Sequence, residues 1–97
     1  MYKLLDIDKA EDGKHKYKVV ILNTETNRKN TVKFGSVDYE DYTIHKDDER
    51  KRLYIERHQK NENWNDPSTS GFWSRWILWN KKTFKASLSD TIKKFKL

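Results

Sequence analysis

The sequence predicts an α+β fold, in which a three-stranded antiparallel meander packs against two or three helices. Two patterns support this prediction. The first third of the chain alternates β-forming segments with polar turns, and the last third spaces its apolar residues as an amphipathic helix does. The chain has 97 residues, a common size for one domain. We therefore expect a single domain, 1–97, with the meander in residues 1–35 and the helical part in residues 36–97.

Aromatic side chains must supply much of the core. Hydrophobic residues make up only 34% of the chain, below the usual ~45–50%, whereas charged residues make up 37%. Aromatic residues still account for 13%, which a disordered chain would lack. These proportions predict a folded domain with a thin, ring-rich core and a heavily charged surface.

The strands are predicted from short β-forming runs separated by turn signals. The runs are Tyr2–Ile7, Tyr17–Leu22 and Thr31–Gly35. Asp12 and Gly13 form a strong turn signal between the first two runs, and the polar segment Asn23–Asn30 separates the last two. Because three strands alone are only marginally stable, we expect helices to cover one face of this sheet.

A linker and a charged helix follow the sheet. The linker, Ser36–Lys46, holds three apolar residues that we expect to anchor it to the core: Tyr39, Tyr42 and Ile44. Asp47–Lys60 is predicted to be helical, with Asp47 or Asp48 as its N-cap.

One face of this helix has an unusual composition. At ~100° per residue, two apolar side chains and two arginines share an arc of about 100°. They are Arg50, Leu53, Tyr54 and Arg57. Either the arginine stems pack and their heads reach solvent, or the guanidinium groups pair with carboxylates elsewhere in the domain.

All four tryptophans lie within the 16 residues Trp64–Trp79. Residues 71–79 read as a short, mostly buried helix whose apolar arc contains Phe72, Trp73, Trp76, Ile77 and Trp79. Rings at helical spacing usually form core. The alternative is that some rings, Trp64 above all, stay exposed beside cations and stack on bases or form a protein interface. The two interpretations are compatible.

The last predicted helix begins after Thr83, its expected N-cap. Its apolar stripe consists of Phe84, Leu88, Ile92 and Phe95. Several lysines lie away from this stripe. Residues 81–97 carry six lysines and one aspartate, a balance of +5, whereas residues 36–66 carry six basic and nine acidic groups.

The net charge of +6 is compatible with two interpretations. A basic balance concentrated at one end of the chain favours polyanionic partners. The alternative is that the lysines serve solubility. The charged groups of the Asp47–Lys60 helix partly cancel, so the C-terminal lysines are the better candidates for phosphate contacts.

The sequence contains no recognisable catalytic, metal or cofactor site. Cysteine is absent, and the three histidines (His15, His45 and His58) do not match zinc-ligand spacing. No serine lies in a nucleophile-like context, and no glycine-rich phosphate loop is present. We therefore predict a protein that is not an enzyme and that holds no metal or cofactor. No apolar run approaches ~18 residues, so we expect a soluble, intracellular protein without a membrane partner.

The segments from Val32 to Asp90 resemble a family of small uncharacterised proteins of large eukaryotic DNA viruses, the giant viruses. The likeness is carried by "FG", "YEDYTIHKD", "YIERH", "ENW" and "DPSTSGFWSRW". It implies a viral setting, with the protein inside the infected host cell and in the virion. It implies no established activity.

The leading hypothesis is a non-catalytic, weakly sequence-specific nucleic-acid-binding protein, with DNA as the expected partner. Its predicted contact residues are Arg50, Arg57, Trp64, Arg75, Lys81, Lys82, Lys85, Lys93 and Lys94. The alternative is a virion structural protein or a host-protein interaction module that uses the tryptophan-rich block. A third hypothesis is a homodimer formed through an open sheet edge.

Overall fold

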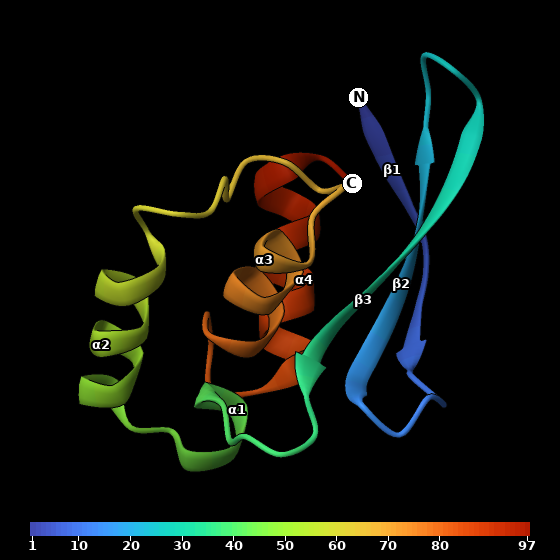
Figure 1. Cartoon of the computed structure of the whole chain (residues 1–97). Coiled ribbons are helices and arrows are strands. Elements are labelled where there is room, and N and C mark those ends of the chain that lie inside the picture. The colour runs from blue at the N-terminus through green and yellow to red at the C-terminus, as the bar shows by residue number, and fades with distance from the viewer.

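The computed structural model describes residues 1–97 and confirms the α+β fold, with an antiparallel meander and all helices on one side of it (Figure 1). The strands are β1 (Tyr2–Lys9), β2 (His15–Asn23) and β3 (Arg28–Ser36), in the order β1-β2-β3. The helices are α1 (Tyr42–His45), α2 (Asp48–His58), α3 (Ser70–Trp73) and α4 (Phe84–Phe95). A π-helical segment, η1 (Ser74–Leu78), continues α3.

The inner face of the sheet is defined by the register of its central strand. Val19 of β2 lies opposite Val32 of β3, and both are buried. Because side chains alternate across a strand, the same register turns the intervening polar residues outward. All three strands are longer than the apolar runs that predicted them, since backbone pairing continues into the polar flanks.

The β1 edge of the sheet is irregular and partly covered. On β1 the register shifts between Leu4 and Asp6, which leaves Leu5 in a bulge with 44% of its surface exposed. The backbone N–H of Leu4 donates to the carbonyl of Leu97 at 3.4 Å, so the C-terminus partly covers this edge. A bulge and a covered edge both disfavour strand addition.

The core is a contact between the sheet and the tryptophan-rich helix. Its eight buried residues are Val19, Ile21, Val32, Phe34, Phe72, Trp73, Ile77 and Leu78. Phe34 and Trp73 are the largest pair across this contact, with ring centroids 6.3 Å apart. Burial of side chains of this size stabilises each by ~1.5–3 kcal/mol relative to exposure, which explains how so few apolar residues hold the fold.

The tryptophan-rich helix starts at the predicted place but is not regular. Thr69 is its N-cap and accepts a hydrogen bond from Phe72 N–H at 3.3 Å. In η1 the helix widens, and Trp79 N–H donates to Ser74 O at 3.1 Å. The widening rotates the helix, so Leu78 is buried while Trp76 is only half-buried, which the regular wheel did not predict.

Thr83 caps α4 as predicted, accepting from Ala86 N–H at 3.2 Å. The predicted stripe is right in part, because Ile92 is 38% exposed and the fully buried residues are Ser87 and Thr91. Small polar residues allow close approach to η1, where Thr91 Oγ1 donates to Trp76 O at 3.1 Å. The sequence pattern missed this face because it counted only apolar residues.

The linker anchors differ from the prediction. Tyr42 is buried, but the prediction that Tyr39 and Ile44 reach the core is wrong, since they are 74% and 55% exposed. The anchor is instead polar. Asp41 is buried, caps α1 through Thr43 N–H, and accepts from Lys16 Nζ at 2.6 Å.

Gly35 provides a test of this packing. It has φ +75°, and a Cβ there would stand 2.7 Å from Leu78 Cδ1, whereas Gly13 has φ +73° and open space around it. We expect Gly35→Ala to lower the free energy of unfolding by about 1–3 kcal/mol more than Gly13→Ala, because only the first adds overpacking to backbone strain. Urea unfolding followed by tryptophan fluorescence measures both. Equal losses would contradict the packing of β3 against η1.

Candidate functional site

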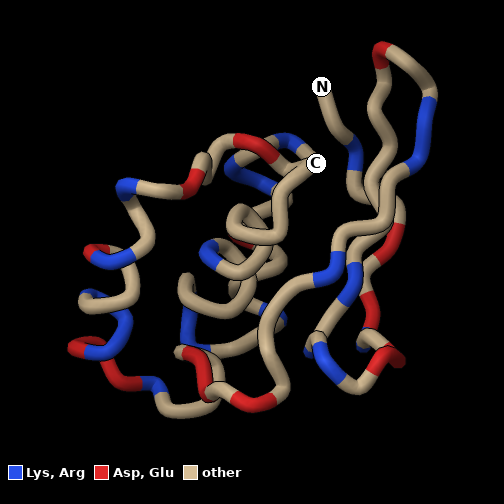
Figure 2. The backbone as a smooth tube through the Cα atoms, in the orientation of Figure 1, with Lys and Arg blue, Asp and Glu red and all other residues tan.

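The predicted contact residues lie in three separate places. Arg50 and Arg57 are on α2, Trp64 and Arg75 belong to the tryptophan-rich block, and the lysines lie on α4 and the loop before it. Figure 2 shows basic and acidic residues mixed along α2. Arg50 and Arg57 also border a cleft that the sequence did not predict.

On α2, the glutamates neutralise a single arginine, Arg52. Arg52 pairs with Glu49 and, at 2.7 Å, with Glu56. Its guanidinium holds the pKa of Glu49 below the usual value. Arg50 and Arg57 have no carboxylate within ion-pair distance, so α2 keeps two uncompensated cations on the face that carries Tyr54.

The outward face of α4 carries lysines with no acid among them. Lys85 and Lys93 are exposed, share a side of the helix with exposed Ser89, and form no ion pair. Lys94 is the exception, with Nζ 3.8 Å from Asp90 and 4.1 Å from the centroid of the Trp76 ring. We refer to Lys85, Ser89 and Lys93 as the α4 lysine face.

The loop before α4 adds two more exposed lysines, Lys81 and Lys82. Lys81 N–H donates to the buried Ser87 Oγ at 2.9 Å, which fixes the loop against the helix. Asp90, the nearest acid in the sequence, accepts from Asn80 Nδ2 at 2.8 Å. This hydrogen bond, and next the charges of Lys94, Lys81 and Lys93, lower the pKa of Asp90.

Arg75 is packed among rings. Its guanidinium carbon lies 4.3 Å from the Trp76 ring centroid and 5.4 Å from that of Trp64. Nη1 donates to Trp79 O at 2.8 Å, whereas Nε is buried without a partner. Burial lowers the pKa of Arg75. This cation therefore holds the tryptophan cluster together.

Trp64 is half-buried. Its Nε1 donates to Glu62 Oε1 at 2.9 Å, and its carbonyl accepts from Trp76 Nε1 at 2.8 Å. Together with the Arg75 contact, these bonds fix the orientation of the indole. The part of the ring that remains exposed is thus held rigidly, as a stacking residue would need to be.

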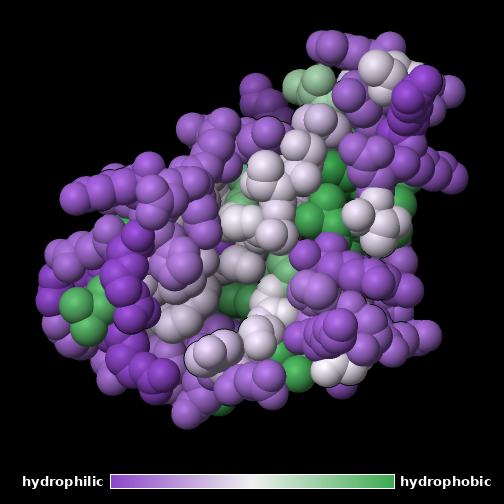
Figure 3. Space-filling view, in the orientation of Figure 1, coloured by the Kyte–Doolittle hydropathy of each residue, from purple (hydrophilic) through white to green (hydrophobic).

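A cleft of about 920 Å³ lies between α2 and the β3 side of the sheet. Figure 3 shows a band of apolar and weakly polar surface between two hydrophilic flanks in the orientation of Figure 1. α2 contributes Arg50, Leu53, Tyr54, Arg57 and His58 to the lining. These include all four residues of the arc predicted from the helical wheel, so that arc faces the cleft.

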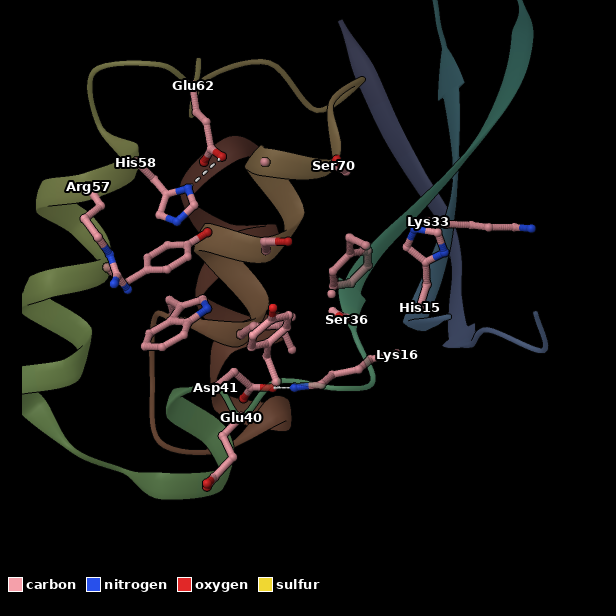
Figure 4. A pocket seen from close by; sticks show the side chains of 18 of the residues that line it. His15, Lys16, Lys33, Ser36, Glu40, Asp41, Arg57, His58, Glu62 and Ser70 are labelled. Atoms are coloured by element: carbon pink, nitrogen blue, oxygen red, sulfur yellow. Dashed lines mark hydrogen bonds and ion pairs between the residues drawn. The ribbon is translucent and has the colours of Figure 1, made fainter. Parts of the chain in front are cut away.

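A stack of rings forms the α2 wall of the cleft. Tyr54 lies between His58 and Trp79, with centroids 4.3 Å from each, and is almost parallel to Trp79. His58 Nδ1 is 3.1 Å from Glu62 Oε2, which orients the imidazole, and Figure 4 shows this contact beside Arg57. Burial raises the pKa of Tyr54, so its hydroxyl stays protonated.

One ion pair lies on the opposite side, where Lys16 and Asp41 meet at the lower end of the cleft. His15 and Lys33 lie on the sheet, and the side chain of Lys33 points away from the cleft (Figure 4). His15 Nδ1 is 2.7 Å from Asp12 Oδ2. Hydrogen bonds from the His15 backbone and ring hold the pKa of Asp12 well below its usual range.

No three or more histidine, aspartate or glutamate side chains gather where they could hold a metal ion. None of the helices has the length and apolar composition needed to cross a membrane.

Residues 5–58, which are 54 of the 97 residues, match the model of a family of unknown function, DUF5754. The chain belongs to this family. The matched span runs from β1 to the end of α2 and so includes both walls of the cleft, while its floor on α3 and η1 lies outside. Comparison with curated proteins and with solved structures gave no significant match.

The packing role of Arg75 predicts that lysine cannot replace it. We expect Arg75→Lys to lower the free energy of unfolding by about 1–3 kcal/mol, because it loses the bond to Trp79 O and the flat contact with two rings. Arg57→Lys, an exposed site on α2, is the matched control and should stay within about 0.5 kcal/mol. Chemical unfolding of both variants checks this, and a neutral Arg75→Lys would contradict the assignment.

Proposed function

We propose that this chain is a non-catalytic nucleic-acid-binding protein that contacts phosphates, with DNA as its partner and weak sequence specificity. The observation that carries the proposal is the α4 lysine face. It is exposed, contains no acid, and continues into Lys81 and Lys82. Uncompensated lysines on one surface are the electrostatic footprint of phosphate binding.

The spacing of these lysines suits a phosphate backbone. Lys85 and Lys93 are eight residues apart, or ~12 Å along the helix axis. Flexible ammonium groups at this separation can reach several phosphates of one strand without a fixed register. Phosphate contacts carry no sequence information. This surface therefore contributes to affinity for nucleic acid and does not distinguish one base from another.

The field around the junction of α2, η1 and α4 is also positive. Burial, and next the nearby charges of Arg75 and Lys81, lower the pKa of Lys51. Lys51 remains in place because its Nζ donates to Asn80 O at 2.6 Å. A cluster of cations that already repel one another gains from a polyanion, which relieves that repulsion on binding.

We also propose a viral setting for this function, on the basis of the sequence resemblance from Val32 to Asp90. In that setting the protein acts inside the infected host cell and accompanies the genome into the virion. A small basic protein without base-reading contacts suits genome binding better than the regulation of single genes.

A salt series tests the proposal. We expect duplex DNA to bind in fluorescence anisotropy with micromolar or tighter affinity, and log K to fall linearly with log salt concentration. In the variant Lys85→Gln/Lys93→Gln, the slope should become shallower by roughly two contacts, uniformly across sequences. Single-stranded DNA in the same series shows which form is preferred.

The control is Lys9→Gln/Lys29→Gln, which removes the same charge from exposed positions on β1 and β3. This control should change the slope much less. If both double variants weaken binding equally, only net charge matters and the α4 lysine face is not a site. Absence of binding at low salt would overturn the proposal.

One observation favours the alternative, a virion structural or host-protein interaction module. Val37, Tyr39 and Ile44 are 49%, 74% and 55% exposed in one short segment beside the cleft. Exposed apolar residues that lie close together are typical of protein contacts. A photo-crosslinking residue at position 39 should then capture a partner that one at Lys3 does not, and Lys85→Gln/Lys93→Gln should leave this capture intact.

A further inference from the structure

The cleft between α2 and β3 has the features of a ligand site. It is separate from the α4 lysine face, to which the proposed phosphate contacts of DNA are assigned. We propose that it binds a phosphate-bearing ligand of nucleotide size, held by Arg50, Tyr54 and Arg57. The phosphate can belong to a free nucleotide or to the 5′-phosphorylated end of a strand. Only the second source rests on the proposed nucleic-acid function.

Three hydrogen-bond donors are aligned on the α2 wall. Arg50, Tyr54 and Arg57 occupy positions i, i+4 and i+7, so they lie on one face over ~10.5 Å of helix. Neither arginine has a carboxylate partner, because Arg52 takes both glutamates of α2. Two planar guanidinium groups with free donors match phosphate oxygens in a bidentate geometry.

Tyr54, in the lining of the cleft, has a hydroxyl that no protein group occupies. The residue is 7% exposed, but the buried side-chain polar atoms without a partner are His45 Nε2 and Arg75 Nε alone, so the Tyr54 hydroxyl, which makes no hydrogen bond, is open to solvent. His58 and Trp79 cover the two faces of its ring, so the ring edge with the hydroxyl is the part that lines the cleft. A hydroxyl that is open to the cleft and not engaged within the protein is available to donate to a bound acceptor.

The carboxylates near the cleft are mostly engaged. Asp41 is paired with Lys16 at 2.6 Å, and Glu62 contacts His58 and Trp64. Glu40, at the lower rim in Figure 4, is the remaining acid in the lining. The lining still carries a net positive charge, which suits an anion, because these three carboxylates face five cations: Lys14, Lys16, Lys33, Arg50 and Arg57.

The shape suits an anion with a planar body. About 920 Å³ is at the upper end of the ~300–1,000 Å³ found for small-molecule sites and is far larger than one phosphate. The floor has small residues, Ser70, Gly71 and Ser74, which leave room. The ring stack ends at His58, whose second face contacts no other ring, so a base could extend the stack there.

Isothermal titration calorimetry with the full chain tests this proposal. The probes are ATP, AMP and tripolyphosphate, with adenosine and citrate as controls that lack phosphate. We expect ATP and AMP to bind, and Arg50→Gln/Arg57→Gln to weaken ATP binding by about tenfold or more. Tyr54→Phe keeps the ring stack and should weaken it by roughly threefold. Circular dichroism confirms that each variant is folded.

The α4 variant separates this site from the proposed nucleic-acid surface. Lys85→Gln/Lys93→Gln should leave ATP binding unchanged, while Arg50→Gln/Arg57→Gln should lose it even if duplex DNA fails to bind the wild-type chain. The cleft proposal is overturned if no phosphate probe binds, if citrate binds as tightly as ATP, or if the two double variants weaken ATP binding equally.

Paired oligonucleotides distinguish the two sources of phosphate. If a 5′-phosphorylated single strand binds more tightly than its 5′-hydroxyl counterpart, and Arg50→Gln/Arg57→Gln removes the difference, the cleft takes a strand end. If AMP binds but the two oligonucleotides are equal, the ligand is a free nucleotide. Both results support a phosphate site, and the failures above exclude it.

Discussion

The helical part of this protein is positioned by one contact, in which α3 and η1 pack on the inner faces of β2 and β3. The chain has few aliphatic side chains, and its largest fully buried side chains are Phe34, Phe72 and Trp73. The widening of the helix at η1 turns Leu78 onto the sheet and leaves Trp76 and Trp79 at the borders of the core. α4 then packs behind η1, and α2 packs beside it through the Tyr54–Trp79 stack.

This arrangement separates two kinds of positive surface. α4 buries small polar residues against η1 and turns Lys85 and Lys93 to solvent, where their charge is screened by water and salt. α2 stands away from the sheet, so Arg50 and Arg57 border a partly enclosed cleft in which an anion would be bound more strongly. The first surface suits a long polyanion and the second a compact one. Arg75 lies between them and acts on neither directly, because rings and a carbonyl occupy it.

The sequence predicted the features that depend on local pattern. Alternation and turn residues located the three strands, and Thr83 and Asp47 capped the expected helices. It did not predict the features that depend on tertiary contacts. Tyr39 is exposed because the linker is anchored by Asp41 and Lys16, a polar pair that no hydropathy pattern signals. The cleft could not be predicted. The arc of arginines and Tyr54 on α2 indicated only that this face of the helix does not pack entirely against an apolar core. The fold brings the nine predicted contact residues together only in part. Their spacing in the sequence could not show that α2 and α4 lie on different sides of η1.

The most direct test of the central claim is an NMR titration of the ¹⁵N-labelled chain with duplex DNA at low salt. We predict that amide shifts concentrate between Lys81 and Lys96, that the outer face of the sheet is unchanged, and that added salt reverses the shifts. Shifts centred on the sheet, or spread evenly over all exposed lysines, would contradict a defined binding surface on α4. A spectrum that does not change at all would contradict nucleic-acid binding itself.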